Sequence, residues 1–243
     1  MKVGVLNEIT RHPVKSMTGE VVTSTHVMPY GLYGDRSHAI KDLSRTDKYL
    51  TITQFQKLAK YRAEFTGDES MEKYPPVKVT TPSGEKVMWE GQAWLKEIET
   101  QSKRSLSKVQ YEPRHVPLGA IEEEHVLIVT DASIEKLKDI WGQEADHRRF
   151  RPNLLISLEK KEPFIEDAWF GKTLRIGDEV ELQVLRHCER CMIITVDPEN
   201  AERDPELLKK IVERRNNHFG VYAKVLKTGK IHAGDEVDLV DAE

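Results

Sequence analysis

Apolar and polar residues alternate over several short stretches of the chain, which is the pattern of half-buried β-strands. These stretches are VGVLNEI from Val3, KVMWE from Lys86, HVLIVT from His125, NLLISL from Asn153 and EVELQVL from Glu179. Two further stretches, residues 174–184 and 230–240, each contain a Gly-Asp turn between apolar runs and predict twin hairpins. The chain is therefore expected to be rich in strands.

Helical periodicity is limited to residues 53–65, 131–141 and 204–217, and the last two stretches open with an Asp-type cap. These helices do not alternate with strands as a doubly wound parallel sheet requires. The pattern favours a β-rich α+β fold, in which an antiparallel β-barrel carries a few helices.

A poorly apolar segment, residues 61–117, contains Pro, Ser and Gly turns and ends near the sequence HVPLGA. A domain boundary is predicted there, with an N-terminal β-barrel-like domain at 1–118 and a second domain at 119–243.

Composition narrows the class of protein. With 243 residues, 32% charged residues and a net charge of −4, the chain can bury a core without disulfides or a structural metal. It has no apolar run of about 18 residues, and its N-terminus is too polar for a signal peptide, so a cytoplasmic protein without a membrane span is expected. The acidic balance argues against a nucleic-acid partner, and any anionic ligand is expected to be small.

Both cysteines lie in RHCERCMIITVD, residues 186–197. If this stretch is one strand, Cys188 and Cys191 point to opposite faces and at most one faces a site. A structural zinc site would need a second close pair of ligands, which the sequence does not offer. A redox disulfide usually stands at a helix N-terminus, whereas the residues after Cys191 read as a continuing strand. Two readings stay open for Cys191: a core residue, or a thiolate favoured by Arg190 that binds a soft metal.

Several groups suit an anion, especially a phosphate. Lys15 and Ser16 follow a proline in HPVKSMTG, and Arg36 follows a turn in GLYGDR, although each alone is typical of a solvated turn. Arg151 precedes Pro152, and Asn153 then enters an apolar strand where its amide needs a partner, in its own turn or in a ligand.

The sequence VTDAS, residues 129–133, predicts a helix N-terminus with hydroxyl side chains. Such hydroxyl groups cap the helix in most proteins and bind a phosphate in some. Capping is the favoured interpretation here.

Five motifs in order, HPVKS, GLYGDR, RFRPN, RCMIITVDP and FGVYAKVLKTGKIHAGDEVDL, resemble the MOSC family, named after the C-terminal domain of molybdenum-cofactor sulfurase. The early motifs are similar to the N-terminal β-barrel domain that precedes MOSC in the mitochondrial amidoxime reducing component and its bacterial relatives. The resemblance implies a molybdenum cofactor, Mo-molybdopterin, whose metal is bound by the Cys191 thiolate. The cofactor contacts it implies are Lys15, Ser16, Arg36, Arg151, Asn153, Arg190 and Tyr222, with Thr130 and Ser133 matching less closely.

The activity implied by this resemblance is reduction of N-hydroxylated small molecules, such as hydroxylaminopurines or amidoximes. Electrons are expected from a separate ferredoxin-, flavin- or cytochrome-type protein, and Asp197 is a candidate for proton delivery. The alternative is a carrier that binds molybdenum cofactor or sulfur without its own turnover.

Overall fold

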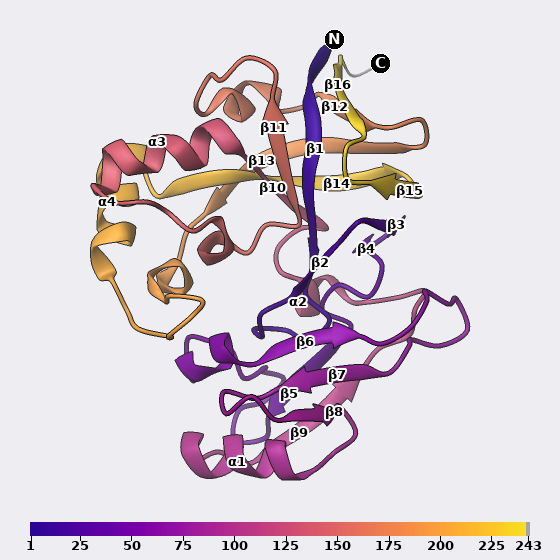
Figure 1. The fold of residues 1–243 in the computed structure, drawn as a ribbon, viewed down its shortest axis with the longest axis vertical. Helices are drawn as coiled ribbons and strands as arrows, with labels where there is room; N and C mark the ends of the chain where they lie inside the picture. Colours follow the sequence, from indigo (N-terminus) through magenta and orange to yellow (C-terminus); the bar gives the residue numbers. More distant parts are fainter. Residues whose placement is uncertain (242–243) are drawn as a thin grey trace.

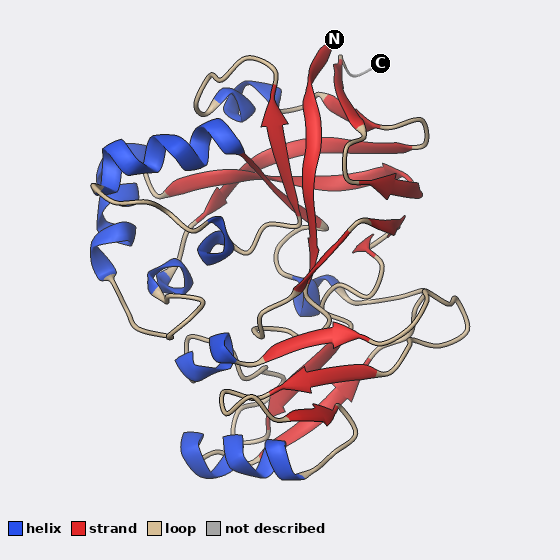
Figure 2. Ribbon diagram, in the orientation of Figure 1, coloured by secondary structure: helices blue, strands red, loops and turns tan. Residues whose placement is uncertain are grey.

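The computed structural model describes residues 1–241, which form a barrel and a second group of small sheets (Figure 1). Helices α3 (Asp131–Trp141) and α4 (Pro205–Arg215) flank one side of the barrel, and α1 (Ala93–Ser102) covers the far end of the small sheets (Figure 2). The short helix α2 (Leu118–Ile121) lies between the two groups.

The barrel is built from an eight-stranded sheet in the order β11-β10-β14-β13-β12-β16-β1-β2, and a further pairing of β11 with β1 closes the first seven strands into a ring. Only the β10–β11 pair in this sheet is parallel. Apolar side chains fill the interior, so the predicted β-rich α+β fold with a mainly antiparallel barrel is confirmed. The strands are β1 (Lys2–Arg11), β2 (Glu20–Val22), β10 (Val126–Thr130), β11 (Leu154–Leu158), β12 (Thr173–Ile176), β13 (Val180–Glu189), β14 (His218–Lys227) and β16 (Glu236–Val240).

Strand β1 ties the beginning of the chain into this barrel. It pairs antiparallel with β11, where Leu6 faces Ile156, and with β16, where Lys2 faces Asp238. The Met1 amine also donates to the Leu239 carbonyl at 2.9 Å. The division at residue 118 stays a prediction, and the first strand of the chain belongs to a sheet made mostly by residues beyond that position.

The remaining strands form three small sheets, two of which surround a separate core rich in aromatic residues. The third contributes Val27, Leu32 and Ile231 to the core of the barrel. One small sheet, β15-β3-β4, joins residues from both halves of the chain. The strands of the three sheets are β3 (Ser24–Met28), β4 (Gly31–Leu32) and β15 (Gly229–His232); β5 (His38–Asp42) and β9 (Leu106–Gln110); and β6 (Arg62–Phe65), β7 (Val77–Thr80) and β8 (Lys86–Met88).

The predictions for the helices held in two of three stretches. Helices α3 and α4 occupy the expected places, and Asp204 caps α4 by accepting from the Glu206 amide. The expected Asp cap of α3 is wrong, because Thr130 and not Asp131 is the capping residue. The predicted helix over 53–65 is wrong: a 3₁₀ turn at Gln56–Lys60 is followed by β6. Pairing of β6 with β7 overrides the helical pattern, because it satisfies the backbone of residues 62–65 in a sheet.

Of the twin hairpins, the first is confirmed by the antiparallel pair β12–β13. The second is wrong, because β15 pairs with β3 whereas β16 pairs with β1 and β12. The turn between β15 and β16 is itself bound to β1, where the Leu6 amide donates to the Asp235 carbonyl at 2.8 Å. Within residues 1–241, none of the helices has both the length and the apolar character needed to cross a membrane.

Candidate functional site

A cavity of about 130 Å³ opens where the β13, β14 and β10 strands meet the N-terminal part of the chain. We call it the thiol cavity, because both cysteines line it. Six predicted site residues also line it: Arg36, Arg151, Asn153, Arg190, Cys191 and Tyr222. Its other lining residues include Glu122, Glu123, Glu124, Phe150 and Cys188.

The two cysteines do not lie on one strand. Strand β13 ends at Glu189, and Cys191 precedes a 3₁₀ turn at Met192–Thr195. The prediction of a continuous strand is wrong, and so is the inference that only one thiol can face the site. The chain leaves the sheet because Ile194 is fully buried in the core formed with α3 and α4. Cys188 is buried and Cys191 is exposed, yet both line the thiol cavity.

Arg190 connects Cys188 to the barrel wall. Its Nη1 donates to Cys188 Sγ at 2.7 Å, and its Nη2 donates to the Phe150 carbonyl at 2.9 Å. Its buried Nε has no hydrogen-bond partner among residues 1–241. Burial, together with the neighbouring Cys188, raises the pKa of Tyr222, so this phenol stays protonated at neutral pH.

Arg36 and Arg151 bring positive charge to the same cavity. Arg36 is 2% exposed and forms an ion pair with Asp35, but its Nε has no partner in the described part of the chain. Burial, with added repulsion from Arg36, lowers the pKa of Arg151 to about 10. Both arginines remain cationic at neutral pH and together favour an anionic ligand.

The backbone holds these two arginines in the left-handed region, with φ of 51° at Arg36 and 55° at Arg151. This conformation costs a non-glycine residue roughly 1–2 kcal/mol. It is fixed by hydrogen bonds: the Arg36 amide donates to the His12 carbonyl at 2.7 Å, and the Arg151 amide donates to the Arg148 carbonyl at 3.1 Å. Such strain is commonly found at binding sites.

Asn153 lies where three strands meet. Its Oδ1 accepts from the Leu127 amide at 3.1 Å, and its Nδ2 lies 3.3 Å from the Thr10 carbonyl. The side chain therefore ties β10 and β1 together while lining the cavity, rather than bonding only its own turn.

Lys15 and Ser16 do not line the thiol cavity. Lys15 Nζ donates to the carbonyls of Ala120 and Ile121 at 2.9 and 3.2 Å and to Glu122 at 3.2 Å, and burial lowers its pKa. Lys15 thereby holds Glu122 at the cavity. Ser16 is buried beside it, with a φ of 69°.

Thr130, Ser133 and Asp197 are not brought to the thiol cavity. Thr130 caps α3 by accepting from the Ser133 amide at 3.3 Å, as the capping interpretation predicted, and both side chains are fully buried. Asp197 pairs with Arg149 at 2.6 Å and accepts from the Glu199 and Asn200 amides, which makes it a turn residue.

Sequence reasoning missed Cys188 and the acidic run at 122–124. The run was visible in the sequence, but only the packing of α2 against Lys15 brings it to the cavity. Cys188 was discounted because the turn after β13 depends on the distant contacts of Ile194.

Comparisons with known proteins agree with this architecture. The profile of the MOSC domain matches residues 83–238, and that of the MOSC N-terminal beta barrel domain matches residues 3–115. The YUAD protein from Bacillus subtilis superposes on 100% of the chain and 98% of its own, with a TM-score of 0.53 and 11% identity. This last likeness is evidence of fold alone.

Curated relatives match about half of the chain. The mitochondrial amidoxime-reducing component 1 of Danio rerio is 35% identical over 121 residues, 46% of this chain and 36% of that protein. The molybdenum cofactor sulfurase of Danio rerio is 34% identical over 121 residues, 44% of this chain and 14% of its own. The human mitochondrial amidoxime reducing component 2 is 31% identical over 125 residues, 46% of this chain and 36% of its own. The matches thus span little more than a third of these relatives' length at most.

Proposed function

The chain belongs to the MOSC family, and on that basis we propose that it binds a molybdenum cofactor in the thiol cavity and reduces N-hydroxylated small molecules. The relatives named as amidoxime reducing components and molybdenum cofactor sulfurase support an association with this cofactor.

One observation carries the proposal: the thiol cavity combines a thiol with two guanidinium groups whose Nε atoms lack partners among the described residues. Arg36 and Arg190 both line this cavity, and the buried Nε of each has no hydrogen-bond partner within residues 1–241. An anionic group could satisfy these donors, and Cys191 is the exposed thiol beside them. A soft metal prefers thiolate, and a phosphate prefers guanidinium groups, so this donor set fits a molybdopterin.

In this proposal, Cys191 ligates the metal and Arg36, Arg151 and Arg190 hold the anionic part of the cofactor. Asn153 fixes the cavity wall by its bonds to two strands, and the protonated Tyr222 offers a hydroxyl donor. When bound, the cofactor supplies two-electron oxygen-atom abstraction from the substrate. Asp197 faces Arg149, so we assign it no proton-transfer role.

The electron donor in this proposal is a separate ferredoxin-, flavin- or cytochrome-type protein. Both cysteines of the chain line the thiol cavity, and an iron–sulfur cluster commonly needs four thiolates. We place the protein in the cytoplasm as part of the same proposal.

The test is expression in a host that makes the cofactor, followed by metal analysis and a benzamidoxime assay with an artificial reductant. Benzamidoxime takes up two electrons and two protons to give benzamidine and water. We expect about one molybdenum per chain and turnover in the wild type. Cys191→Ser should lose turnover and the cysteine contribution to the sulfur–metal signal in X-ray absorption, because a hydroxyl stays protonated near neutral pH and is a poor ligand for a soft metal.

Cys188→Ser is the matched control, and it should keep the metal. A smaller sulfur–metal signal in Cys188→Ser, with an unchanged signal in Cys191→Ser, would reverse the assignment. Molybdenum binding without turnover would favour the carrier function. The similarity to molybdenum cofactor sulfurase and the second thiol on the cavity are consistent with that function.

A further inference from the structure

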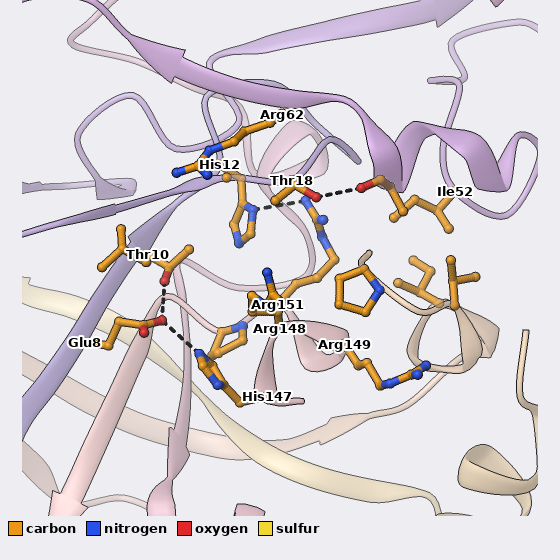
Figure 3. Close-up of a pocket in the computed structure, with 17 residues that line it drawn as sticks. Glu8, Thr10, His12, Thr18, Ile52, Arg62, His147, Arg148, Arg149 and Arg151 are labelled. Atoms are coloured by element: carbon orange, nitrogen blue, oxygen red, sulfur yellow. Dashed lines mark hydrogen bonds and ion pairs between the residues drawn. The ribbon is translucent and has the colours of Figure 1, made fainter. Parts of the chain in front are cut away.

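A second cavity, of about 170 Å³, is also lined by Arg151 (Figure 3). We call it the histidine cavity, because His12 and His147 line it. It shares only Arg151 and Ile193 with the thiol cavity. The site proposed above makes no use of its remaining lining residues.

His12 contributes a buried hydrogen-bond donor to this cavity. It is 4% exposed, and its ring points into the space between the labelled side chains in Figure 3. Arg151 Nη2 lies 3.2 Å from His12 Nδ1, and a guanidinium can only donate, so Nδ1 accepts and the ring proton is on Nε2. This Nε2 has no hydrogen-bond partner among residues 1–241. Burial and the charges of Arg151 and Arg36 lower the pKa of His12, which keeps the imidazole neutral.

The charge of the cavity is positive. Its arginines are Arg62, Arg148, Arg149 and Arg151, and its single carboxylate is Glu8. Glu8 is already engaged by His147 at 2.9 Å and by Thr10 at 2.8 Å.

The arginines differ in how well they are neutralised. Arg148 forms ion pairs with Asp146 and Glu199 at 2.6 Å each, and Arg149 forms one with Asp197 at 2.6 Å. Arg62, by contrast, has a side chain that is 57% exposed, and its Nε lies 3.7 Å from Glu64. Arg151 is buried and shared with the thiol cavity, so Arg62 is the exposed cation most available to a ligand.

Apart from Thr18 and Gly19, the rest of the lining is apolar. Val21, Ile52, Ala59, Pro152, Ile193, Val196 and Pro198 contribute to it. A strongly hydrated anion such as inorganic phosphate would leave these surfaces unused, whereas an apolar body would cover them.

We propose that the histidine cavity binds a small organic carboxylate with a flat apolar body. The carboxylate accepts from His12 Nε2–H and faces Arg62, and the body packs on the apolar lining. This site requires neither the molybdenum cofactor nor the reductase activity.

The experiment is calorimetric titration of the full chain with benzoate, with and without cofactor. We expect saturable binding at one site per chain. Val21→Trp should weaken it at least about tenfold, because Val21 is 59% exposed and a bulkier side chain there obstructs the cavity without disturbing the core. His12→Phe should also weaken it about tenfold, which is the effect of losing one hydrogen bond to a charged group. Arg62→Ala should weaken it about two- to fivefold, as expected for an exposed ion pair.

Two matched controls lie outside the cavity. Val212→Trp replaces an exposed valine on α4, and Arg175→Ala removes an exposed arginine paired with Asp238, and both should bind benzoate as the wild type does. Val21→Trp and Arg62→Ala keep the test decisive if His12→Phe does not fold. Absence of benzoate binding, or binding unaffected by Val21→Trp, would overturn the proposal. So would equal binding of neutral benzamide, or preference for inorganic phosphate.

Discussion

Among single residues, Arg36 has the most constrained environment of the proposed cofactor contacts. Its guanidinium is buried against Asp35, which is fully buried, and its backbone is in the left-handed region. Replacing it by alanine would leave the Asp35 charge without its partner, which destabilises a folded protein by several kcal/mol. Arg36→Lys is therefore the better probe, because it keeps the charge and removes the planar fork.

We expect Arg36→Lys to lower cofactor occupancy about tenfold, since roughly 1.5 kcal/mol of a charge-assisted bond is lost. The measurement is molybdopterin content per folded chain after limited cofactor supply. Arg175→Lys, an exposed arginine on β12, is the control and should retain full occupancy. Full occupancy combined with lost turnover in Arg36→Lys would instead place Arg36 at the substrate.

A second residue links stability to pH. His38 is 2% exposed and packs edge-on against Trp89, with ring centroids 5.2 Å apart, and burial lowers its pKa from 6.5 to about 4. Between these values the unfolded chain binds a proton that the folded chain does not. Stability is therefore complete above about pH 6.5 and falls as the pH drops toward 4, by about 3 kcal/mol from this residue.

Denaturant unfolding at a series of pH values measures this effect. In His38→Gln, the free energy of unfolding should fall less steeply between pH 6.5 and 4 than in the wild type. His12 acts in the same direction, because burial also lowers its pKa, and it is unchanged in the variant. Identical slopes in the two proteins would show that His38 is protonated without loss of folding.

The residues that sequence reasoning could identify are those with a distinctive chemical setting. Cys191 beside Arg190, and Arg151 before Pro152, were recognisable from their neighbours, and the structure places Cys191, Arg190 and Arg151 on one cavity. His12 Nε2 and Cys188 became visible only in three dimensions, because the burial of His12 and the turn after Cys188 depend on residues far away in the chain.

At the scale of elements, local signals succeeded where the chain makes local contacts. The caps of α3 and α4 act within three residues of the helix start, so the sequence alone located these helices. Residues 53–65 and 230–240 were misassigned because their strands pair with β7, β3 and β1, which are distant in sequence.

Helix α3 provides a prediction that separates capping from cofactor binding. Thr130 accepts from the Ser133 amide, and its hydroxyl lies 3.1 Å from the buried Glu166 carboxyl group. Thr130→Ala should lower the free energy of unfolding by about 1–2 kcal/mol through loss of the cap. Cofactor occupancy at a temperature where the variant is folded should be unchanged. Thr130→Ser retains the hydroxyl and should restore most of the stability. Loss of cofactor from a variant that remains folded would show instead that Thr130 contacts the cofactor.

For the whole molecule, the closed barrel depends on β1. This strand completes the ring between β11 and β16, and it buries Leu6 completely. Deleting residues 1–6 should cost at least about 3 kcal/mol, from the burial of Leu6 and the backbone hydrogen bonds on both sides. It would also leave two unpaired strand edges that favour aggregation. Thermal unfolding and light scattering measure these two effects.

The matching control is a circular permutant that retains every strand. Its new ends lie in the turn at Gly84, around which there is open space, and a short glycine-rich linker joins the original ends. Met1 and Leu239 are already hydrogen-bonded to each other, so the linker need not span a large distance. The permutant should be close to the wild type in stability. If it were as unstable as the deletion variant, continuity of the chain near Gly84 would matter more than β1.

Closure of the barrel by β1 also sets an order of events during synthesis. Lys2 and its partner Glu236 are 234 positions apart, so β1 leaves the ribosome long before β16 exists. At about 5–20 residues per second, it waits roughly 10 to 50 seconds for that partner. The sheets of β5 with β9 and of β6 to β8 need only residues between 38 and 110, and they can form in the meantime. The nascent protein is thus expected to fold first in its middle, while β1 is the segment most in need of a chaperone.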